Sequence, residues 1–206
     1  MSVFKDWEGR KKQMEQIAFE LQMQFSEKDD WGLRRRLSDF HLFKKGHSKE
    51  IFNVISKKET FLEEQFFIFD YKYTIQAGNT PVKYYQTVFH IQSKKLGLPE
   101  FLLKPENFFH KIGAFLGMQD IDFEEHPEFS QKNLLQGEDE DLVRNMMTVN
   151  PLLFRFFTVE RDWSLEGVGY FMVFYSQQKL LHPGIVKNFL KKGMEVYDIL
   201  KSKEEE

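Results

Sequence analysis

The clearest pattern in the chain is a pair of runs, 66–75 and 82–91, in which residues alternate between two faces. One face of the first run is aromatic or branched throughout, with Phe67, Phe69, Tyr71, Tyr73 and Ile75. The opposite face is mixed, with Phe66, Ile68, Asp70, Lys72 and Thr74. A period of two residues is that of a β-strand, and Ala77-Gly78-Asn79 supplies turn residues between the runs. The pattern therefore predicts a long β-hairpin.

The remaining pattern predicts helices at both ends and short elements between them. An apolar stripe at helical spacing predicts an N-terminal helix over 5–26, with Met14, Ile17, Ala18, Leu21 and Phe25. Similar spacing predicts helices over 106–116, from 137 to 147, after Pro151, and over 183–200. Strands are predicted at 51–56, 101–104 and 132–136, with a second hairpin at 163–166 and 170–175.

These strands come as hairpins and not in alternation with helices, which favours an α+β fold. We expect a mostly antiparallel β-sheet flanked by N- and C-terminal amphipathic helices. A chain of 206 residues suits a single domain. Its predicted parts are the helix 5–26, a sheet-rich core over 40–176 with inserted helices, the helix 183–200 and a frayed tail at 201–206.

The amino-acid composition argues against several classes of function. The absence of Cys excludes disulfides, thiolate metal sites and thiol nucleophiles. A net charge of −3 argues against a nucleic-acid binder, which usually has a basic face. No apolar run reaches the roughly 18 residues of a membrane span, and the N-terminus lacks a signal peptide, so the expected location is cytoplasmic. Peripheral membrane association and the oligomeric state are left open.

The densest candidate site is the acidic segment 120–126. Asp120, Asp122 and His126 could hold a hard divalent cation that activates water, which would suit a metal-dependent hydrolase. The alternative is a loop whose Ile121 and Phe123 anchor in the core while the acids are solvated. Their spacing matches no metal-binding motif whose mechanics are known to us.

Asp70 is the one carboxylate inside the aromatic strand. It could be an acid with a raised pKa, or a structural group paired with a cation such as Lys83 or Arg144. The six histidines have no metal-binding spacing, and no phosphate-binding loop or nucleophile elbow is present. The sequence predicts no catalytic residue and no cofactor.

Several short motifs, when they are taken together, carry a resemblance to a known protein family. They are Phe69-Asp70-Tyr71-Lys72-Tyr73, Gln86-Thr87-Val88, Leu98-Pro99-Glu100-Phe101 running to Pro105-Glu106, Gln119 to Phe123 with His126 to Ser130, and Leu134 to Glu140 with Val143-Arg144. As a series, over residues 33–200, they resemble a widespread family of uncharacterised bacterial proteins. The resemblance implies no activity and no catalytic residues. Many members look membrane-tethered through N-terminal hydrophobic helices, whereas the N-terminal helix predicted here is polar and amphipathic.

The sequence thus favours a non-catalytic binding or scaffold module that recognises a protein or a membrane-proximal partner. One alternative is the metal-dependent hydrolase described above. Another is a carrier of an apolar ligand, suggested by 23 Phe residues. The carrier predicts a cavity of at least about 300 Å³ enclosed by the aromatic faces of the long hairpin. Whether the protein is an enzyme is left uncertain, and a non-enzyme is favoured.

Overall fold

The computed structural model of the chain describes residues 6–59, 64–106 and 119–201. The chain divides into two units, which we describe separately. Unit 1 comprises residues 1–89 and 178–192, and unit 2 comprises residues 90–177 and 193–206. That the whole chain forms a single domain stays a prediction.

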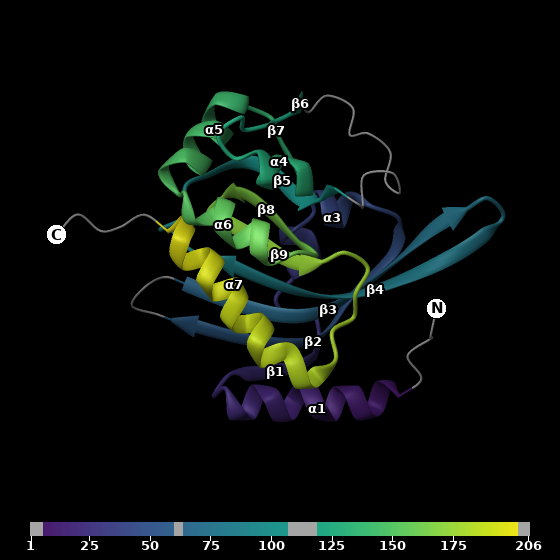
Figure 1. The fold of residues 1–206 in the computed structure, drawn as a ribbon. Helices are drawn as coiled ribbons and strands as arrows, with labels where there is room; N and C mark the ends of the chain where they lie inside the picture. The colour runs from purple at the N-terminus through teal and green to yellow at the C-terminus, as the bar shows by residue number, and fades with distance from the viewer. Residues whose placement is uncertain (1–5, 60–63, 107–118, 202–206) are drawn as a thin grey trace. The chain divides into compact units, whose positions relative to one another are not determined.

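Unit 1 is a sheet with helices and carries the N-terminal part of the chain (Figure 1). Its strands follow the order β1-β2-β3-β4, with antiparallel pairing of β1 with β2 and of β2 with β3. Its elements are α1 (Trp7–Glu20), β1 (Gln24–Lys28), α2 (Leu33–Arg36), α3 (His41–Lys44), β2 (His47–Glu59), β3 (Glu64–Ala77), β4 (Thr80–Gln92), the 3-10 helix η2 (Pro183–Ile185) and the start of α7 (Val186–Leu200).

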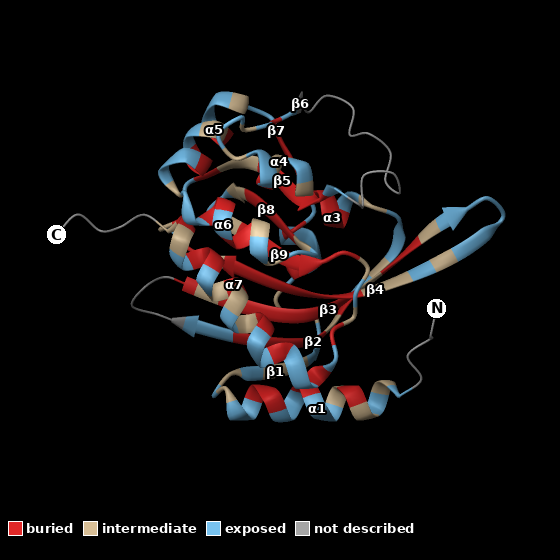
Figure 2. Ribbon diagram, in the orientation of Figure 1, coloured by how far each residue is buried: buried red, intermediate tan, exposed pale blue. Residues whose placement is uncertain are grey.

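Both faces of β3 are buried, and they differ in the side chains that they carry. Phe67, Phe69, Tyr71 and Tyr73 are buried on one face, Phe66, Ile68, Asp70 and Thr74 are buried on the other, and strands β2 to β4 are buried over much of their length (Figure 2). Phe43 of α3 covers this aromatic face, with its ring centroid 4.6 Å from that of Tyr71. Asp70 points to the other face, where it meets Arg10 of α1. The sheet of unit 1 is therefore covered by α3 on one face and by α1 on the other.

The N-terminal helix is shorter than the predicted 5–26. Helix α1 ends at Glu20, and Phe25 lies in β1. The chain turns at Gln22, whose φ of 55° is left-handed. A left-handed residue just after a helix cannot continue it, so the apolar residues beyond it are free to form a strand.

Gly46 precedes β2 at a position where a side chain would meet the backbone of a neighbouring strand. Its φ is +64°, and a Cβ there would lie 2.3 Å from the carbonyl oxygen of Thr74. We expect Gly46→Ala to lower the free energy of unfolding by about 2–4 kcal/mol, because it adds overpacking against backbone to left-handed strain.

Gly32 provides the control for this prediction. It has a similar φ of +68°, but a Cβ there would meet nothing within 4 Å. Gly32→Ala should therefore cost only the conformational strain, about 1–2 kcal/mol. Urea unfolding of both variants separates the two contributions, and equal losses would show that the contact with Thr74 is harmless.

Unit 2 is a second antiparallel arrangement of strands with helices. Its strands follow the order β9-β8-β5-β7-β6, and each neighbouring pair is antiparallel. Its elements are β5 (Leu98–Pro105), β6 (Gln119–Asp120), α4 (Pro127–Lys132), β7 (Asn133–Gly137), α5 (Glu140–Val149), α6 (Leu152–Val159), β8 (Trp163–Gly169) and β9 (Phe171–Ser176). Residues 90–92 of β4 and 193–200 of α7 also belong to it.

Aromatic rings join the helices of unit 2. Phe154 of α6 packs edge-on against Phe123 and Phe129, with centroid distances of 4.8 and 5.1 Å. Phe156 reaches Phe174 of β9 at 6.1 Å. A Cβ at Gly137 would lie 2.5 Å from Val143, so the absence of a side chain there lets α5 approach β7 closely.

The predicted fold class is confirmed: the chain is α+β, with antiparallel strands and a helix near each end. Both predicted hairpins and the strands near 51–56, 101–104 and 132–136 are present. So are the helices predicted from 137, after Pro151 and toward residue 200. The helix predicted over 106–116 and the frayed tail beyond 201 lie outside the described residues.

Candidate functional site

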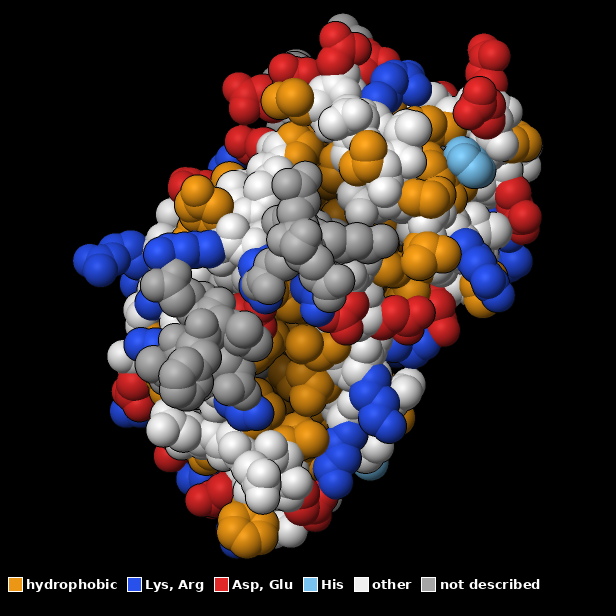
Figure 3. All heavy atoms as spheres, turned by 90° about the vertical axis from the view of Figure 1, so that its left-hand side faces the viewer, with side chains coloured by type: hydrophobic (Ala, Val, Ile, Leu, Met, Phe, Trp, Pro, Cys, Tyr) orange, Lys and Arg blue, Asp and Glu red, His pale blue; other side chains and the backbone are white. Residues whose placement is uncertain are grey.

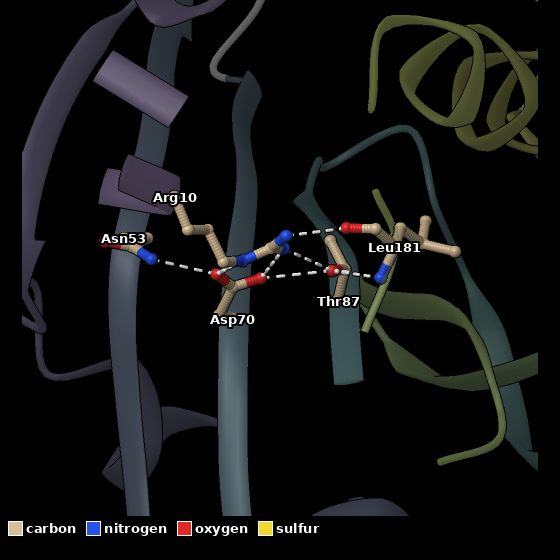
Figure 4. A network of polar contacts seen from close by, with 5 residues as sticks. All are labelled: Arg10, Asn53, Asp70, Thr87 and Leu181. Carbon is tan, nitrogen blue, oxygen red and sulfur yellow. Dashed lines mark hydrogen bonds and ion pairs between the residues drawn. The ribbon is translucent and has the colours of Figure 1, made fainter. Parts of the chain in front are cut away.

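A buried ion pair anchors α1 to the sheet of unit 1 (Figure 4). The Nε and Nη2 atoms of Arg10 each donate to a different oxygen of Asp70, both at 2.7 Å. Asn53 Nδ2 donates to the same carboxylate at 2.9 Å and Thr87 Oγ1 at 3.0 Å. Arg10 is 1 % exposed and Asp70 is fully buried. A buried charge pair of this kind is tolerated because hydrogen bonds satisfy the carboxylate.

The local sequence explains how the side chains of Arg10 and Asn53 reach Asp70. Arg10 lies on the same stripe of α1 as the buried Met14 and Ile17, so the stripe that packs on the sheet also carries the guanidinium. Asn53 has a left-handed φ of 50° at a register shift between β2 and β3. Asn tolerates this conformation better than most residues, and the resulting bulge redirects its side chain.

The segment before η2 closes the network. Arg10 Nη1 donates to the carbonyl of Leu181 at 2.7 Å, and the Leu181 amide donates to Thr87 Oγ1 at 3.1 Å. The partner of Asp70 is therefore Arg10, and the predicted partners were wrong. Lys83 is exposed, and Arg144 pairs with Glu140 at 2.7 Å. Of the two interpretations of Asp70, a structural group fits the geometry, because both of its carboxylate oxygens accept hydrogen bonds from neighbouring side chains.

A pocket of about 310 Å³ opens beside this anchor. Asn53 belongs to both, since it lines the pocket and donates to Asp70. Three aromatic rings form the apolar part of the pocket, from α1, β2 and β4. Trp7 lies 4.9 Å from Tyr85 and 5.7 Å from Phe52 between ring centroids. Because Trp7 is one helical turn from Arg10, the ion pair fixes the position of this ring.

The polar part of the pocket is balanced in charge. Three acidic and three basic residues line it, namely Glu8, Glu27, Glu50, Lys11, Lys28 and Lys72. Lys11 Nζ lies 3.3 Å from Glu8 and 3.4 Å from Glu27, and Lys72 pairs with Glu50. Hydrogen bonds, first with Glu8 and then with Glu27, raise the pKa of Lys11 above its usual value. The pocket therefore presents hydrogen-bond donors and acceptors without a net charge.

The apolar-carrier hypothesis places a cavity against the aromatic faces of the long hairpin. On β3, this pocket lies on the face opposite to Tyr71 and Tyr73, and β4 contributes Tyr85 to it. Lys72 lines the pocket and alternates with Tyr71 and Tyr73 along β3. On the face of Tyr71, the Phe43 ring packs at 4.6 Å from Tyr71 and 6.2 Å from Phe69. The pocket that the hairpin helps to form is thus partly aromatic and partly charged.

The structure does not bring the predicted metal ligands together. Asp120 accepts a hydrogen bond from Gln136 Nε2 at 2.7 Å, and the backbone carbonyl of Asp122 accepts one from Arg144 at 2.7 Å. The His126 ring stacks on Phe154 with centroids 3.8 Å apart. Within residues 6–59, 64–106 and 119–201, no group of three or more His, Asp or Glu side chains is placed to hold a metal. The hydrolase hypothesis lacks the converging ligands that it predicts.

Unit 2 has its own buried polar cluster on β5, β8 and β9. Tyr175 donates to Glu166 Oε1 at 2.5 Å, and Gln177 Nε2 donates to Ser164 Oγ at 3.1 Å. Lys104 is 3 % exposed. Burial lowers the pKa of Lys104, and the nearby carboxylates of Glu106, Asp120 and Glu166 offset this only in part.

The lowered pKa of Lys104 predicts a pH dependence of stability. Because the folded protein releases this proton at lower pH than the unfolded chain, the free energy of unfolding should rise as the pH increases toward 10.5. Lys104→Met removes this contribution, so its profile should be flatter than that of the wild type between the lowered pKa and pH 10.5. Urea unfolding at a series of pH values tests this, with the exposed-pair variant Lys132→Met as control. Parallel profiles for wild type and Lys104→Met would contradict it.

The residues that build the pocket carry little functional signal in the sequence. Trp7 falls in the predicted N-terminal helix, and Phe52 and Tyr85 fall in predicted strands. One signal was present: Arg10 is a charged residue within the apolar stripe that continues with Met14 and Ile17. A buried cation in such a stripe requires a buried anion, and Asp70 was the carboxylate set among aromatic residues.

Helices long and apolar enough to cross a membrane are absent from the part of the chain that the structure describes.

Comparison with known proteins identifies a fold relative. No family model matches the sequence, and no curated protein matches it. The crystal structure of the mycobacterial trehalose monomycolate transport factor A is similar in fold, with a TM-score of 0.66 and 11 % sequence identity. The match covers 93 % of this chain and 94 % of that one. At this identity, the similarity establishes a shared fold.

Proposed function

We propose that this chain is a non-catalytic binding module whose unit 1 pocket receives the neutral, hydroxyl-rich head group of an amphipathic lipid. The observation that carries the proposal is the pocket itself, which joins three aromatic rings to charge-balanced Glu and Lys side chains. Its volume of about 310 Å³ is at the lower end of small-ligand pockets, which suits a head group.

The charges of the pocket favour a neutral head group over a charged one. An anionic group would meet the carboxylates of Glu8, Glu27 and Glu50. A quaternary ammonium group would suit the aromatic rings, but it would meet three Lys ammonium groups. Hydroxyl groups both donate and accept, so they can bond to carboxylates and ammonium groups alike.

The aromatic rings favour a head group that is built on a saturated ring. The faces of Trp7 and Tyr85 carry partial negative charge, and the C–H bonds of a sugar ring are weakly positive. Both rings are partly exposed, so they offer an apolar platform that a ligand can reach. A sugar stacked on such a platform keeps its hydroxyl groups directed toward the pocket rim.

The fold relative supports a lipid-related role. It is named as a transport factor for trehalose monomycolate, a glycolipid. The membrane-proximal partner that the sequence favours would, on this proposal, be the lipid itself. Recognition of a separate protein stays a prediction, for which the pocket offers no specific support.

Titration with surfactants that share one alkyl chain tests the head-group preference. Decyl maltoside, decylphosphocholine and decyl phosphate, each below its micelle concentration, can be compared by calorimetry. We expect the maltoside to bind at least about tenfold more tightly than either charged surfactant, a difference of about 1.4 kcal/mol. Equal binding of all three would leave only the alkyl chain as a determinant, and tighter binding of a charged surfactant would overturn the neutral head-group assignment.

A further inference from the structure

Asn53 is the buried polar residue of the unit 1 pocket. It is 3 % exposed, whereas the other described residues that line the pocket are exposed or partly exposed. The carboxylates of Glu8 and Glu27, for example, stand in solvent at the rim. Asn53 therefore forms the floor of the pocket, where a bound group is furthest from water and a hydrogen bond is most selective.

Asp70 fixes the orientation of the Asn53 amide (Figure 4). Asn53 Nδ2 donates to the Asp70 carboxylate at 2.9 Å, and two hydrogen bonds from Arg10 hold that carboxylate in place. A carboxylate that is paired with a guanidinium group only accepts hydrogen bonds. A flipped amide would bring Asn53 Oδ1 against the carboxylate, and two acceptors repel each other. The Nδ2 atom is therefore committed to Asp70, and Oδ1 is directed away from it.

The Oδ1 atom of Asn53 is an acceptor with capacity to spare. Among the residues that the structure describes, none donates a hydrogen bond to it. It is also not one of the enclosed polar atoms that lack a partner. It is therefore open to the pocket that Asn53 lines.

We infer that Asn53 is the specificity-determining residue of the head-group pocket, and that its Oδ1 atom accepts a hydrogen bond from one hydroxyl group of a sugar ring. The inference rests on the proposed function and names the group that selects the ligand. The hydroxyl groups of a sugar stand around the edge of its ring. A ring stacked on Trp7 and Tyr85 therefore has one edge at the rim of the pocket and another at Asn53.

An acceptor at the floor selects for a donor in the ligand. A phosphodiester and a quaternary ammonium group have no hydrogen-bond donor, so Asn53 disfavours both, whatever the net charge of the pocket. Because the network around Asp70 holds the amide in place before binding, little freedom is lost when the hydrogen bond forms. A ligand that lacks the matching donor removes water from Oδ1 without replacing it, and the unpaired acceptor weakens binding.

An alkyl chain alone has other places to bind. Hydrophobic side chains reach the surface among charged ones on the side of the molecule shown in Figure 3. The ligands that are compared should therefore share one alkyl chain, so that its contribution is the same for all of them. Decyl maltoside and analogues in which fluorine replaces one hydroxyl group at a time meet this condition. Fluorine is close to a hydroxyl group in size, but it cannot donate a hydrogen bond.

Calorimetry with the wild type and Asn53→Gly tests the assignment. Glycine adopts the left-handed φ of 50° at this position without strain and removes the amide. One fluorinated analogue should bind the wild type at least about tenfold more weakly than decyl maltoside does. Asn53→Gly should bind these two ligands equally, because the acceptor that distinguishes them is absent.

Thr87→Val is the matched control for an effect on the buried network. It removes a different hydrogen bond to Asp70, and Thr87 does not line the pocket. The ratio of the two affinities should therefore stay that of the wild type. Circular dichroism confirms that each variant is folded.

Nuclear magnetic resonance of the wild type gives a second measurement that needs no variant. Saturation with decyl maltoside should shift the side-chain amide signals of Asn53 more than saturation with the weakly bound analogue does. Equal shifts, an equal affinity ratio in the wild type and Asn53→Gly, or equal binding of all the analogues to the wild type would overturn the assignment of Asn53 and leave the proposed function standing. A wild type that does not bind decyl maltoside would overturn both.

Discussion

Replacing Arg10 with methionine lowers the free energy of unfolding by about 3–5 kcal/mol, because it leaves the charge of Asp70 buried without its partner. The carboxylate is fully buried and loses both of its bonds to the guanidinium. The segment before η2 loses the bond from Arg10 to the Leu181 carbonyl as well. Urea unfolding followed by far-ultraviolet circular dichroism measures the change.

Two further variants make this expectation specific to the ion pair. Combining Arg10→Met with Asp70→Leu removes both charges, so the double variant should recover much of the loss. Lys187→Met breaks the exposed pair with Glu20 in the same unit and should cost less than about 1 kcal/mol. A loss for Arg10→Met no larger than that for Lys187→Met would show that the network does not anchor α1.

Replacing Trp7 with alanine weakens binding of decyl maltoside at least about tenfold, because it removes the ring that contacts both other aromatic residues of the pocket. The ring packs 4.9 Å from Tyr85 and 5.7 Å from Phe52. The ring is only partly buried, so the variant should remain folded. Calorimetry gives the affinity, and thermal unfolding gives the stability.

Trp31→Ala is the control for this loss of binding. Trp31 is also partly buried in unit 1, where its ring lies 5.9 Å from Phe67, and it does not line the pocket. Its removal should leave the affinity unchanged. If both variants bind decyl maltoside as the wild type does, the surfactant occupies another part of the molecule.

The hairpins were predictable because their signal is local. A strand places residues two apart on one face, so the pattern of β3 alone separates its aromatic face from the face of Asp70. The end of α1 was not predictable in this way. The apolar stripe runs on to Phe25, and the left-handed turn at Gln22 carries no glycine that would have signalled it.

The candidate site was less accessible to sequence reasoning, because it depends on contacts between distant segments. Arg10 and Asp70 are sixty residues apart in the chain. The redirected side chain of Asn53 depends on a bulge whose register only the paired strands define. The acidic segment 120–126 was the more conspicuous candidate, but its side chains bond to separate neighbours. In this chain, a cluster of charged residues in the sequence is therefore a weaker indication of the candidate site than a single charge within an apolar stripe.

The most direct test of the proposed function is to locate the bound head group by nuclear magnetic resonance. In a titration of the isotope-labelled protein with decyl maltoside, the account predicts that the shifted signals cluster at the Trp7 indole and at the amides of Lys11, Phe52, Asn53 and Tyr85, which line the pocket. Shifts confined to residues that do not line the pocket, or no saturable shifts at all, would contradict it.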